Sequence, residues 1–304
     1  MNSFMQSAQV VLVTGAGSGI GRAVATALAR AGHTVYASMR DIAGRNRGRA
    51  AGLTALATGE GWRLQVIELD VLSEPSCRAA VDQVLLANGR IDVVVNNAGM
   101  LMTGLTEAFT PAQVAKIIDT NALSWLRVNR AVLPAMRRQG QGTLVYIGST
   151  TSRIHEPFIG PYVASKAAGD ALAEVMGFEA RPFGIDSVIV TPGAFTTGTE
   201  HFAHAESPID AAVLAQYGTL PARAAGLAAK LDAVDAAHGG ALGVEAVGDA
   251  VCRVLALAHG RRPPRITVDA QRKGVEELDA LHGAKQRAFF EQMGLDDLLP
   301  SAGR

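Results

Sequence analysis

The stretch Thr14-Gly15-Ala16-Gly17-Ser18-Gly19-Ile20-Gly21 decides the fold of this chain. It follows the short apolar run 9–14 and precedes the alanine-rich run 22–30, which has a helical composition. A buried parallel strand, a glycine-rich turn and a helix together bind the pyrophosphate of a dinucleotide. The glycines let the backbone approach the phosphates, and the N–H groups that open the helix face them. A plain tight turn could also contain these glycines. The position of the glycine-rich stretch between a strand and a helix favours a dinucleotide site.

Composition limits the remaining possibilities. The chain has 304 residues, of which 48% are hydrophobic, and it balances 28 basic against 28 acidic side chains. This supports a large core and argues against nucleic acid or an anionic membrane as the main partner. Cys77 and Cys252 are too few for a disulfide framework or a cysteine-based zinc site, so we expect reduced thiols, no metal and a cytoplasmic protein. Residues 1–8 lack a basic segment and no apolar run is long enough to span a membrane, so neither a leader nor a membrane span is expected.

Apolar runs and helical patterns alternate along the rest of the chain. This alternation predicts an α/β fold, a doubly wound parallel sheet with helices on both faces, over about residues 1–270. We expect further strands at 33–39, 62–69, 91–95, 142–149, 185–190 and 265–269, and helices at 75–88, 111–138, 162–181 and 243–258.

A second motif places a tyrosine four residues before a lysine. Tyr162 and Lys166 would share one face of a helix, with Ser149 thirteen residues upstream at the end of a buried strand. An ammonium beside a phenol favours the phenolate and lowers the phenol's pKa from about 10 towards the range of a general acid or base. Such a pair is common on exposed helices, so its meaning depends on the other motifs.

The motifs together resemble the short-chain dehydrogenase/reductase family. The fingerprint TGxxxGIG, Asp70, the NNAG of residues 96–99, Asn121, Ser149 and the YxxxK pair follow one another in the family's order over about residues 8–195. The resemblance implies a Rossmann fold in three layers, a nicotinamide cofactor and hydride transfer between the cofactor and a ketone or secondary alcohol. A nucleotide-sensing or scaffold protein that has lost the chemistry is the alternative, but none of the reactive residues is missing.

The resemblance also implies catalytic roles for four residues. Tyr162 would donate a proton to the developing alkoxide, or accept one in oxidation, and Ser149 would hydrogen-bond the same oxygen. Lys166 would lower the pKa of Tyr162 and bind the ribose next to the nicotinamide. The backbone carbonyl of Asn121 would hold a water that extends the proton path.

Thirteen residues are expected to hold the dinucleotide. Asp70 would accept from the adenine amino group, although a turn aspartate is the alternative, and Thr197 would lie near the carboxamide or the diphosphate. The full set is Gly15, Ser18, Gly19, Ile20, Arg40, Asp70, Val71, Asn97, Gly99, Tyr162, Lys166, Gly193 and Thr197.

The end of the second strand favours NADP over NAD. Met39 stands where an NAD-selecting acid would lie, and the guanidinium of Arg40 suits a 2′-phosphate. Residues 35–41 also resemble the NADP-preferring steroid and retinoid reductases of the family. Asp41 is the competing candidate as an NAD selector. For the arginines that follow (Arg45, Arg47 and Arg49), a solvated basic loop is expected, and the alternative is that they add positive potential at the same place.

The last part of the chain predicts a substrate lid and an extension. Residues 194–242 are expected to form two helices over the site, broken at Pro208 and Pro221, and residues 271–304 a helical extension. Apolar residues that border the cleft in this fold predict a lipophilic small-molecule substrate. They are Met100, Leu101, Met102, Ile154, Phe158, Ile159, Phe195, Phe202, Leu214 and Tyr217. A run of small residues (Ala164, Ala167, Ala168 and Gly169) suits either a homodimer or homotetramer interface or internal packing.

Overall fold

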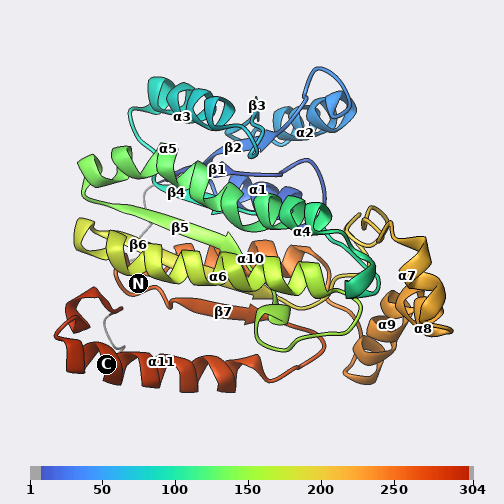
Figure 1. The fold of residues 1–304 in the computed structure, drawn as a ribbon. Helices are drawn as coiled ribbons and strands as arrows, with labels where there is room; N and C mark the ends of the chain where they lie inside the picture. Colours follow the sequence, from blue (N-terminus) through green and yellow to red (C-terminus); the bar gives the residue numbers. More distant parts are fainter. Residues whose placement is uncertain (1–7, 301–304) are drawn as a thin grey trace.

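A computed structural model describes residues 8–300. The expectation of no leader depends partly on residues 1–7, which lie outside the described residues. In the described chain, parallel strands form a sheet in the order β3-β2-β1-β4-β5-β6-β7 (Figure 1). This confirms the doubly wound parallel sheet. The strands are β1 (Val10–Val13), β2 (Thr34–Met39), β3 (Leu64–Glu68), β4 (Val93–Asn96), β5 (Gly142–Ile147), β6 (Ile185–Pro192) and β7 (Arg265–Val268).

Helices cover both faces of the sheet and complete three layers. One apolar cluster joins the sheet to α1 (Gly19–Arg30), α2 (Arg47–Gly59) and α10 (Glu245–Leu255). A second joins the opposite face to α3 (Glu74–Asn88), α5 (Ser124–Gln139) and α6 (Gly160–Ala180). Strands buried on both faces consist of continuous apolar runs, which explains why β1 and β4 contain so many valines.

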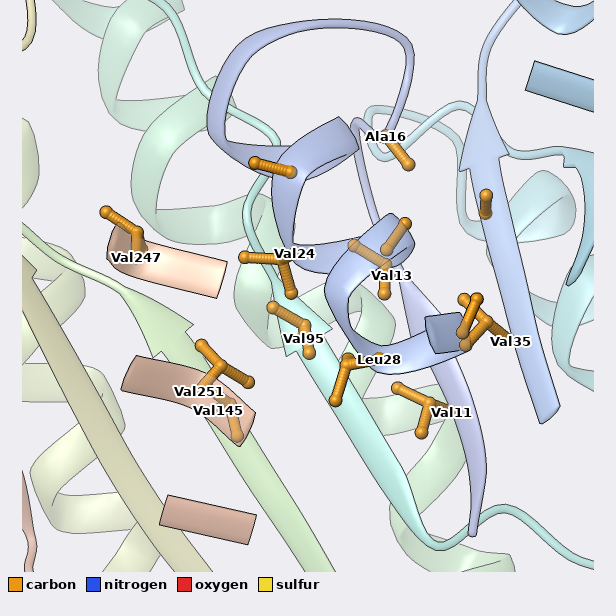
Figure 2. Close-up of a cluster of buried hydrophobic side chains, with 14 of the residues drawn as sticks. Val11, Val13, Ala16, Val24, Leu28, Val35, Val95, Val145, Val247 and Val251 are labelled. Carbon is orange, nitrogen blue, oxygen red and sulfur yellow. The ribbon is translucent and has the colours of Figure 1, made fainter. Parts of the chain in front are cut away.

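The first cluster fixes α1 over the centre of the sheet (Figure 2). Val24 and Leu28 are four residues apart, so they share the face of α1 that packs on the sheet, and both are fully buried. Val251 of α10 extends the same cluster over β5. Replacing a buried leucine such as Leu28 by alanine typically costs about 2–5 kcal/mol. The helix start that follows the glycine-rich turn is therefore held rigidly.

The strand order creates a crevice at one edge of the sheet. The chain passes from β1 to β2 on one side, whereas β4 pairs with β1 on the other side. Ligands bind outside the carboxyl ends of parallel strands at such a reversal. The loops that follow β1 and β4 therefore face a common cleft.

The helix expected over 111–138 is confirmed, and it contains a π-helical turn that the sequence did not indicate. The chain forms α4 (Pro111–Ile118), then a π-helical turn over Asp119–Leu123, and then α5. The extra residue of a π turn changes which side chains face inward, and such turns are frequent at functional sites. Asn121 lies in this turn and is fully buried.

The basic stretch after β2 also differs from expectation. Arg47 and Arg49 belong to α2 rather than to a loop, and Arg49 pairs with Glu200 at 2.5 Å. No clear apolar stripe marks this helix, since only Leu53 and Ala57 are buried in it.

Residues 194–242 contain three helices instead of two. They are α7 (Ala211–Gln216), α8 (Leu220–Ala225) and α9 (Leu227–Ala237), and they lie together beyond one end of α6 (Figure 1). Pro221 does not break a helix but occupies the first turn of α8, where its missing N–H costs little.

The last segment is anchored to the body by ionic and aromatic contacts. Helix α11 (Val275–Met293) places Asp279 against Arg153 at 2.7 Å, and Phe290 meets Phe178 of α6 edge to face. Between residues 8 and 300, no helix has the length and apolar character that a membrane span requires. The same part of the chain contains no group of three or more His, Cys, Asp or Glu placed to hold a metal ion. Cys77 and Cys252 are free thiols.

Candidate active site

A cleft of about 840 Å³ opens at the carboxyl ends of the strands. It collects residues from the loops after β1, β2, β3, β4, β5 and β6, together with the first turns of α6. Two of the sequence-predicted site residues, Asn121 and Thr197, do not line it. Those that do are Gly15, Ser18, Gly19, Ile20, Arg40, Asp70, Val71, Asn97, Gly99, Ser149, Tyr162, Lys166 and Gly193.

The glycine-rich turn forms a cradle that side chains would fill. Gly15 has φ +64°, and a Cβ there would lie 2.8 Å from the Cα of Ala98. A Cβ on Gly21 would overlap the side-chain amide of Asn97 and the carbonyl of Gly15. The bare backbone of this turn leads directly into the N-terminus of α1. The residues present therefore fit a pyrophosphate, because nothing but backbone stands between it and the helix dipole.

The NNAG motif ties β1 to β4. The side-chain amide of Asn97 donates to the carbonyls of Thr14 at 2.9 Å and Gly15 at 3.1 Å. In return, the hydroxyl of Thr14 accepts from the backbone N–H groups of Asn97 and Ala98. Asn96 points to the other side and donates to Asn129 of α5 at 3.0 Å. Both strand ends are thus fixed where the cradle begins.

Arg40 and Asp41 lie in different places relative to the cleft. Arg40 is exposed, and both Arg40 and the buried Met39 line the cleft. Asp41 is not among the lining residues; its backbone is left-handed (φ 52°), and its carboxylate accepts from the N–H of Arg45 at 2.9 Å. The carboxylate of Asp41 therefore stabilises its own loop, while the guanidinium of Arg40 remains at the cleft.

Asp70 makes a turn hydrogen bond and also lines the cleft. Its Oδ1 accepts from the N–H of Leu72 at 3.0 Å, which is a turn hydrogen bond. The residue also lines the cleft beside Val71. A carboxylate has several acceptor positions, so the turn bond does not prevent Asp70 from accepting another donor.

Ser149 and Tyr162 meet at the cleft from two elements. Ser149 follows β5, and Tyr162 lies in the first turn of α6. The Ser149 oxygen accepts from the hydroxyl of Thr151 at 2.9 Å and from its N–H at 3.2 Å. These bonds orient the Ser149 hydroxyl and leave its own proton for another acceptor.

In the described structure the pKa of Tyr162 is shifted upward, and Lys166 is not among the causes of that shift. Burial raises the pKa of Tyr162 to about 12, and a hydrogen bond to Ser149 only partly opposes this. Lys166 donates instead to the carbonyl of Ile147 at 2.8 Å. Burial also lowers the pKa of Lys166 to about 8, against the field of Asp170. Desolvation has the largest effect on both pKa values, and it moves them in opposite directions because it disfavours the charged form of each group.

Asn121 acts from behind the wall of the cleft through its side chain. Its amide donates to the carbonyl of Met100 and to Ser165 Oγ, both at 2.9 Å, and accepts from the N–H of Met100 at 2.8 Å. Ser165 lies on α6 between Tyr162 and Lys166. Asn121 thus joins the loop after β4 to the helix that carries the reactive pair, a contact that the sequence did not indicate.

The loop after β6 corrects one prediction. Gly193 lines the cleft, and a Cβ there would collide with Asp269 and Gln271. Thr197 is exposed and does not reach the cleft, whereas Thr199 lines it beside Gly19. The left-handed turn at Gly198 (φ 72°) separates the two threonines.

Residues that follow β7 also reach the site, although no sequence motif indicates this. Gln271 accepts from the N–H of Ala194 at 2.8 Å and donates to its carbonyl at 3.2 Å and to Asp235 of α9. Lys273 donates to Glu156 at 2.6 Å in the cleft wall. The pairing of β7 with β6 brings this segment to the cleft, and the two strands are far apart in the sequence.

His201 is a further lining residue that no sequence motif indicates. Its ring meets the Tyr162 ring edge to face, with centroids 6.0 Å apart. Its Nε2 is shut off from solvent and has no hydrogen-bond partner among the described residues. Burial, assisted by Lys166, lowers the pKa of His201 to about 4.

The small residues of α6 are partly explained by internal packing. A Cβ on Gly169 would lie 2.8 Å from the Trp125 ring of α5. Ala164 is exposed, whereas Ala167 and Ala168 are half-buried.

Comparison with known proteins agrees with the site. A family model described as short chain dehydrogenase matches residues 9–207. The chain belongs to this family. Over 190 residues it is 35% identical to a 3-ketodihydrosphingosine reductase of Bacteroides thetaiotaomicron, covering 62% of this chain and 65% of that protein. Over 192 residues it is 37% identical to human 17-beta-hydroxysteroid dehydrogenase type 1, covering 62% of this chain and 57% of that protein.

A solved structure extends the similarity to almost the whole fold. The crystal structure of a short-chain dehydrogenase from Streptomyces avermitilis matches with a TM-score of 0.73 and 28% identity, covering 95% of this chain and 98% of that one. The two curated relatives are matched over less than two thirds of their own length. The family model therefore covers β1 to β6, the cradle and the reactive residues, and it ends before α7.

Proposed function

We propose that this protein is an NADP(H)-dependent oxidoreductase that interconverts a ketone and a secondary alcohol. One observation carries the proposal: Tyr162 and Ser149 lie in the same cleft as the glycine cradle of residues 15–21. A dinucleotide on that cradle would extend along the edge of the sheet towards the pair. A bound nicotinamide would supply the hydride in reduction and accept it in oxidation.

The residues of the chain would handle the proton and the developing charge. When the ketone carbon gains a hydride, negative charge develops on the oxygen, and Tyr162 donates its proton there to give the alcohol. The Ser149 hydroxyl, oriented by Thr151, donates to the same oxygen. Lys166 contributes positive charge and is the candidate to hold the ribose next to the nicotinamide. The backbone carbonyl of Asn121 is the candidate to hold the water that returns a proton.

NADP is the proposed cofactor because of the charge at the end of β2. Arg40 lines the cleft where the adenosine ribose would lie, and the carboxylate of Asp41 is engaged with its own loop. A guanidinium favours a 2′-phosphate, while an acid in that place would repel it. Asp70 is the candidate to accept from the adenine amino group, and Gly193, which lines the cleft, is the candidate to contact the cofactor near the nicotinamide.

A lipophilic substrate fits the wall beside Tyr162. Leu101, Ile159, Leu227 and Leu231 form a buried cluster there, with Phe202 and the Tyr162 ring packed against it. Such a surface favours apolar carbon skeletons. The two curated relatives are named for a sphingoid ketone and a hydroxysteroid, which agrees with this class.

The remaining organisation follows from the same assignment. We propose one catalytic domain over about residues 1–270, with residues 194–242 as a lid that excludes water and residues 271–304 as an extension. The protein would work in the cytoplasm as a homodimer or homotetramer, with the exposed part of α6 at the interface.

Turnover by the purified chain tests this proposal. We expect the protein to oxidise NADPH in the presence of lipophilic ketones, and the loss of absorbance at the nicotinamide band measures this reaction. The rate with NADH should be lower. Dinucleotide binding without turnover across a broad ketone panel would contradict the proposal and favour a nucleotide sensor.

A further inference from the structure

His201 is the one polar ring in the described apolar wall around Tyr162 that lacks a hydrogen-bond partner. The ring contacts the Tyr162 ring edge to face and lies in the segment between β6 and α7. The neighbouring Phe202 packs with the buried leucines of this wall. The imidazole therefore stands next to the position where the reacting carbonyl would bind.

The unpaired Nε2 of His201 requires an explanation. A buried polar atom without a partner forfeits the hydrogen bond that water would give it, and native structures contain few such atoms. At neutral pH the ring is uncharged, so it offers one N–H donor and one acceptor. A leucine or phenylalanine would fill the same wall without leaving a polar atom unpaired.

Other roles for His201 fit the geometry less well. A metal ligand would need partners, and the described residues contain no group of three or more that could hold a metal. A proton donor to the carbonyl would compete with Tyr162, which already shares the cleft with Ser149. A ring fixed by the fold alone would be expected to have its nitrogens satisfied by neighbours. What remains is a partner that arrives with the substrate.

We propose that His201 determines specificity by forming a hydrogen bond with a second oxygen of the substrate. This rests on the proposed function. Because the ring centroids of His201 and Tyr162 are 6.0 Å apart, the second oxygen would lie one or two carbons from the reacting carbonyl. The substrate class is then ketones that carry a neighbouring hydroxyl, ester or second carbonyl on an apolar skeleton.

Two ketones of equal chain length separate this idea from simple hydrophobic binding. Ethyl 3-oxohexanoate carries an ester next to the reacting ketone, and nonan-4-one replaces it by methylenes. With NADPH, the wild-type protein should show a kcat/KM at least about tenfold higher for the ester, since a site built around a hydrogen bond rejects an analogue that lacks it. His201→Phe should abolish this preference by lowering kcat/KM for the ester alone. His201→Gln, which keeps a donor and an acceptor, should retain part of it.

His238→Phe provides a matched control, because His238 is an exposed histidine at the end of α9 and does not line the cleft. It should keep the wild-type preference. An unchanged preference in folded His201→Phe and His201→Gln variants would overturn the assignment, as would a wild-type protein that reduces both ketones equally well. No turnover of any ketone by the wild-type protein would contradict the proposed function itself, and with it this role of His201.

Discussion

Lys166 and Tyr162 lie one helical turn apart, yet the ammonium of Lys166 is 5.7 Å from the centre of the Tyr162 ring and is bonded to the backbone. Burial shifts the two groups in opposite directions, raising the pKa of Tyr162 to about 12 and lowering that of Lys166 to about 8. At neutral pH the phenol therefore holds its proton and the amine is mostly charged. These are the states that reduction of a ketone requires.

The reductive rate should depend on pH through Lys166. Below its pKa of about 8 the lysine is charged and stabilises the developing alkoxide, and above it this charge is lost while Tyr162 is still protonated. We expect kcat/KM for reduction to be constant from about pH 6 to 7.5 and to fall above about pH 8. Lys166→Met should lower the plateau by about 100-fold and remove the fall. Lys285→Met on α11 is the control and should keep the wild-type pH profile. If kcat/KM of Lys166→Met still falls above about pH 8, Lys166 is not the origin of the fall.

Cofactor choice should depend on Arg40. Arg40→Ala removes the guanidinium that faces the proposed 2′-phosphate, and a charge-assisted hydrogen bond is worth about 1.5–3 kcal/mol. The Kd for NADPH should rise about 10–100-fold, with little change for NADH, as measured by titration of the nicotinamide fluorescence. Arg47→Ala is the matched control, because Arg47 is exposed and does not line the cleft. Equal weakening of both cofactors would assign Arg40 a merely structural role.

The cradle should not tolerate a side chain at Gly21. In Gly21→Ala the new Cβ would displace the amide of Asn97, which ties β4 to β1. We expect a lower melting temperature and loss of dinucleotide binding. Gly48→Ala on α2, where a Cβ meets nothing within 4 Å, should be neutral or stabilise by up to about 1 kcal/mol. Full cofactor affinity in Gly21→Ala would show that the cradle is placed wrongly.

The hydrogen bond between Gln271, which follows β7, and Asp235 of α9 should be lost when the glutamine is replaced by a charged side chain. The side-chain amide of Gln271 donates a hydrogen bond to the buried carboxylate of Asp235. Gln271→Glu would replace this donor by a second carboxylate. Unpaired buried groups of this kind cost about 1–3 kcal/mol, so thermal stability should fall and KM should rise. Adding Asp235→Asn restores a donor between the two side chains and should recover most of the loss. If the double variant is no better than Gln271→Glu, the two residues are not coupled.

The sequence predicted the fold where local pattern and tertiary structure agree. Each strand of the sheet is a short apolar run that ends at a turn residue, so all seven described strands were found with small differences at their ends. The helix α2 was missed because only Leu53 and Ala57 of it are buried. The π turn around Asn121 was missed because one inserted residue leaves the apolar pattern of a helix almost unchanged.

The site was predictable only where the chain forms it locally. The cradle, the asparagines after β4 and the Tyr162 helix all follow strands whose ends meet at one edge. His201, Gln271 and Lys273 come to that edge through long-range packing that no motif announces. Helical spacing predicts that Lys166 lies near Tyr162, whereas burial, which the spacing does not reveal, has the largest effect on both pKa values.

The most direct test is the rate of NADPH-dependent ketone reduction by Tyr162→Phe, measured together with the Kd for NADPH. Removing the hydroxyl removes the proton donor but keeps the ring that packs in the wall of the cleft. We predict a loss of about 100–10,000-fold in kcat, the range for general acid catalysis, with an unchanged Kd for NADPH. A Tyr162→Phe variant that reduces ketones at the wild-type rate would contradict the account.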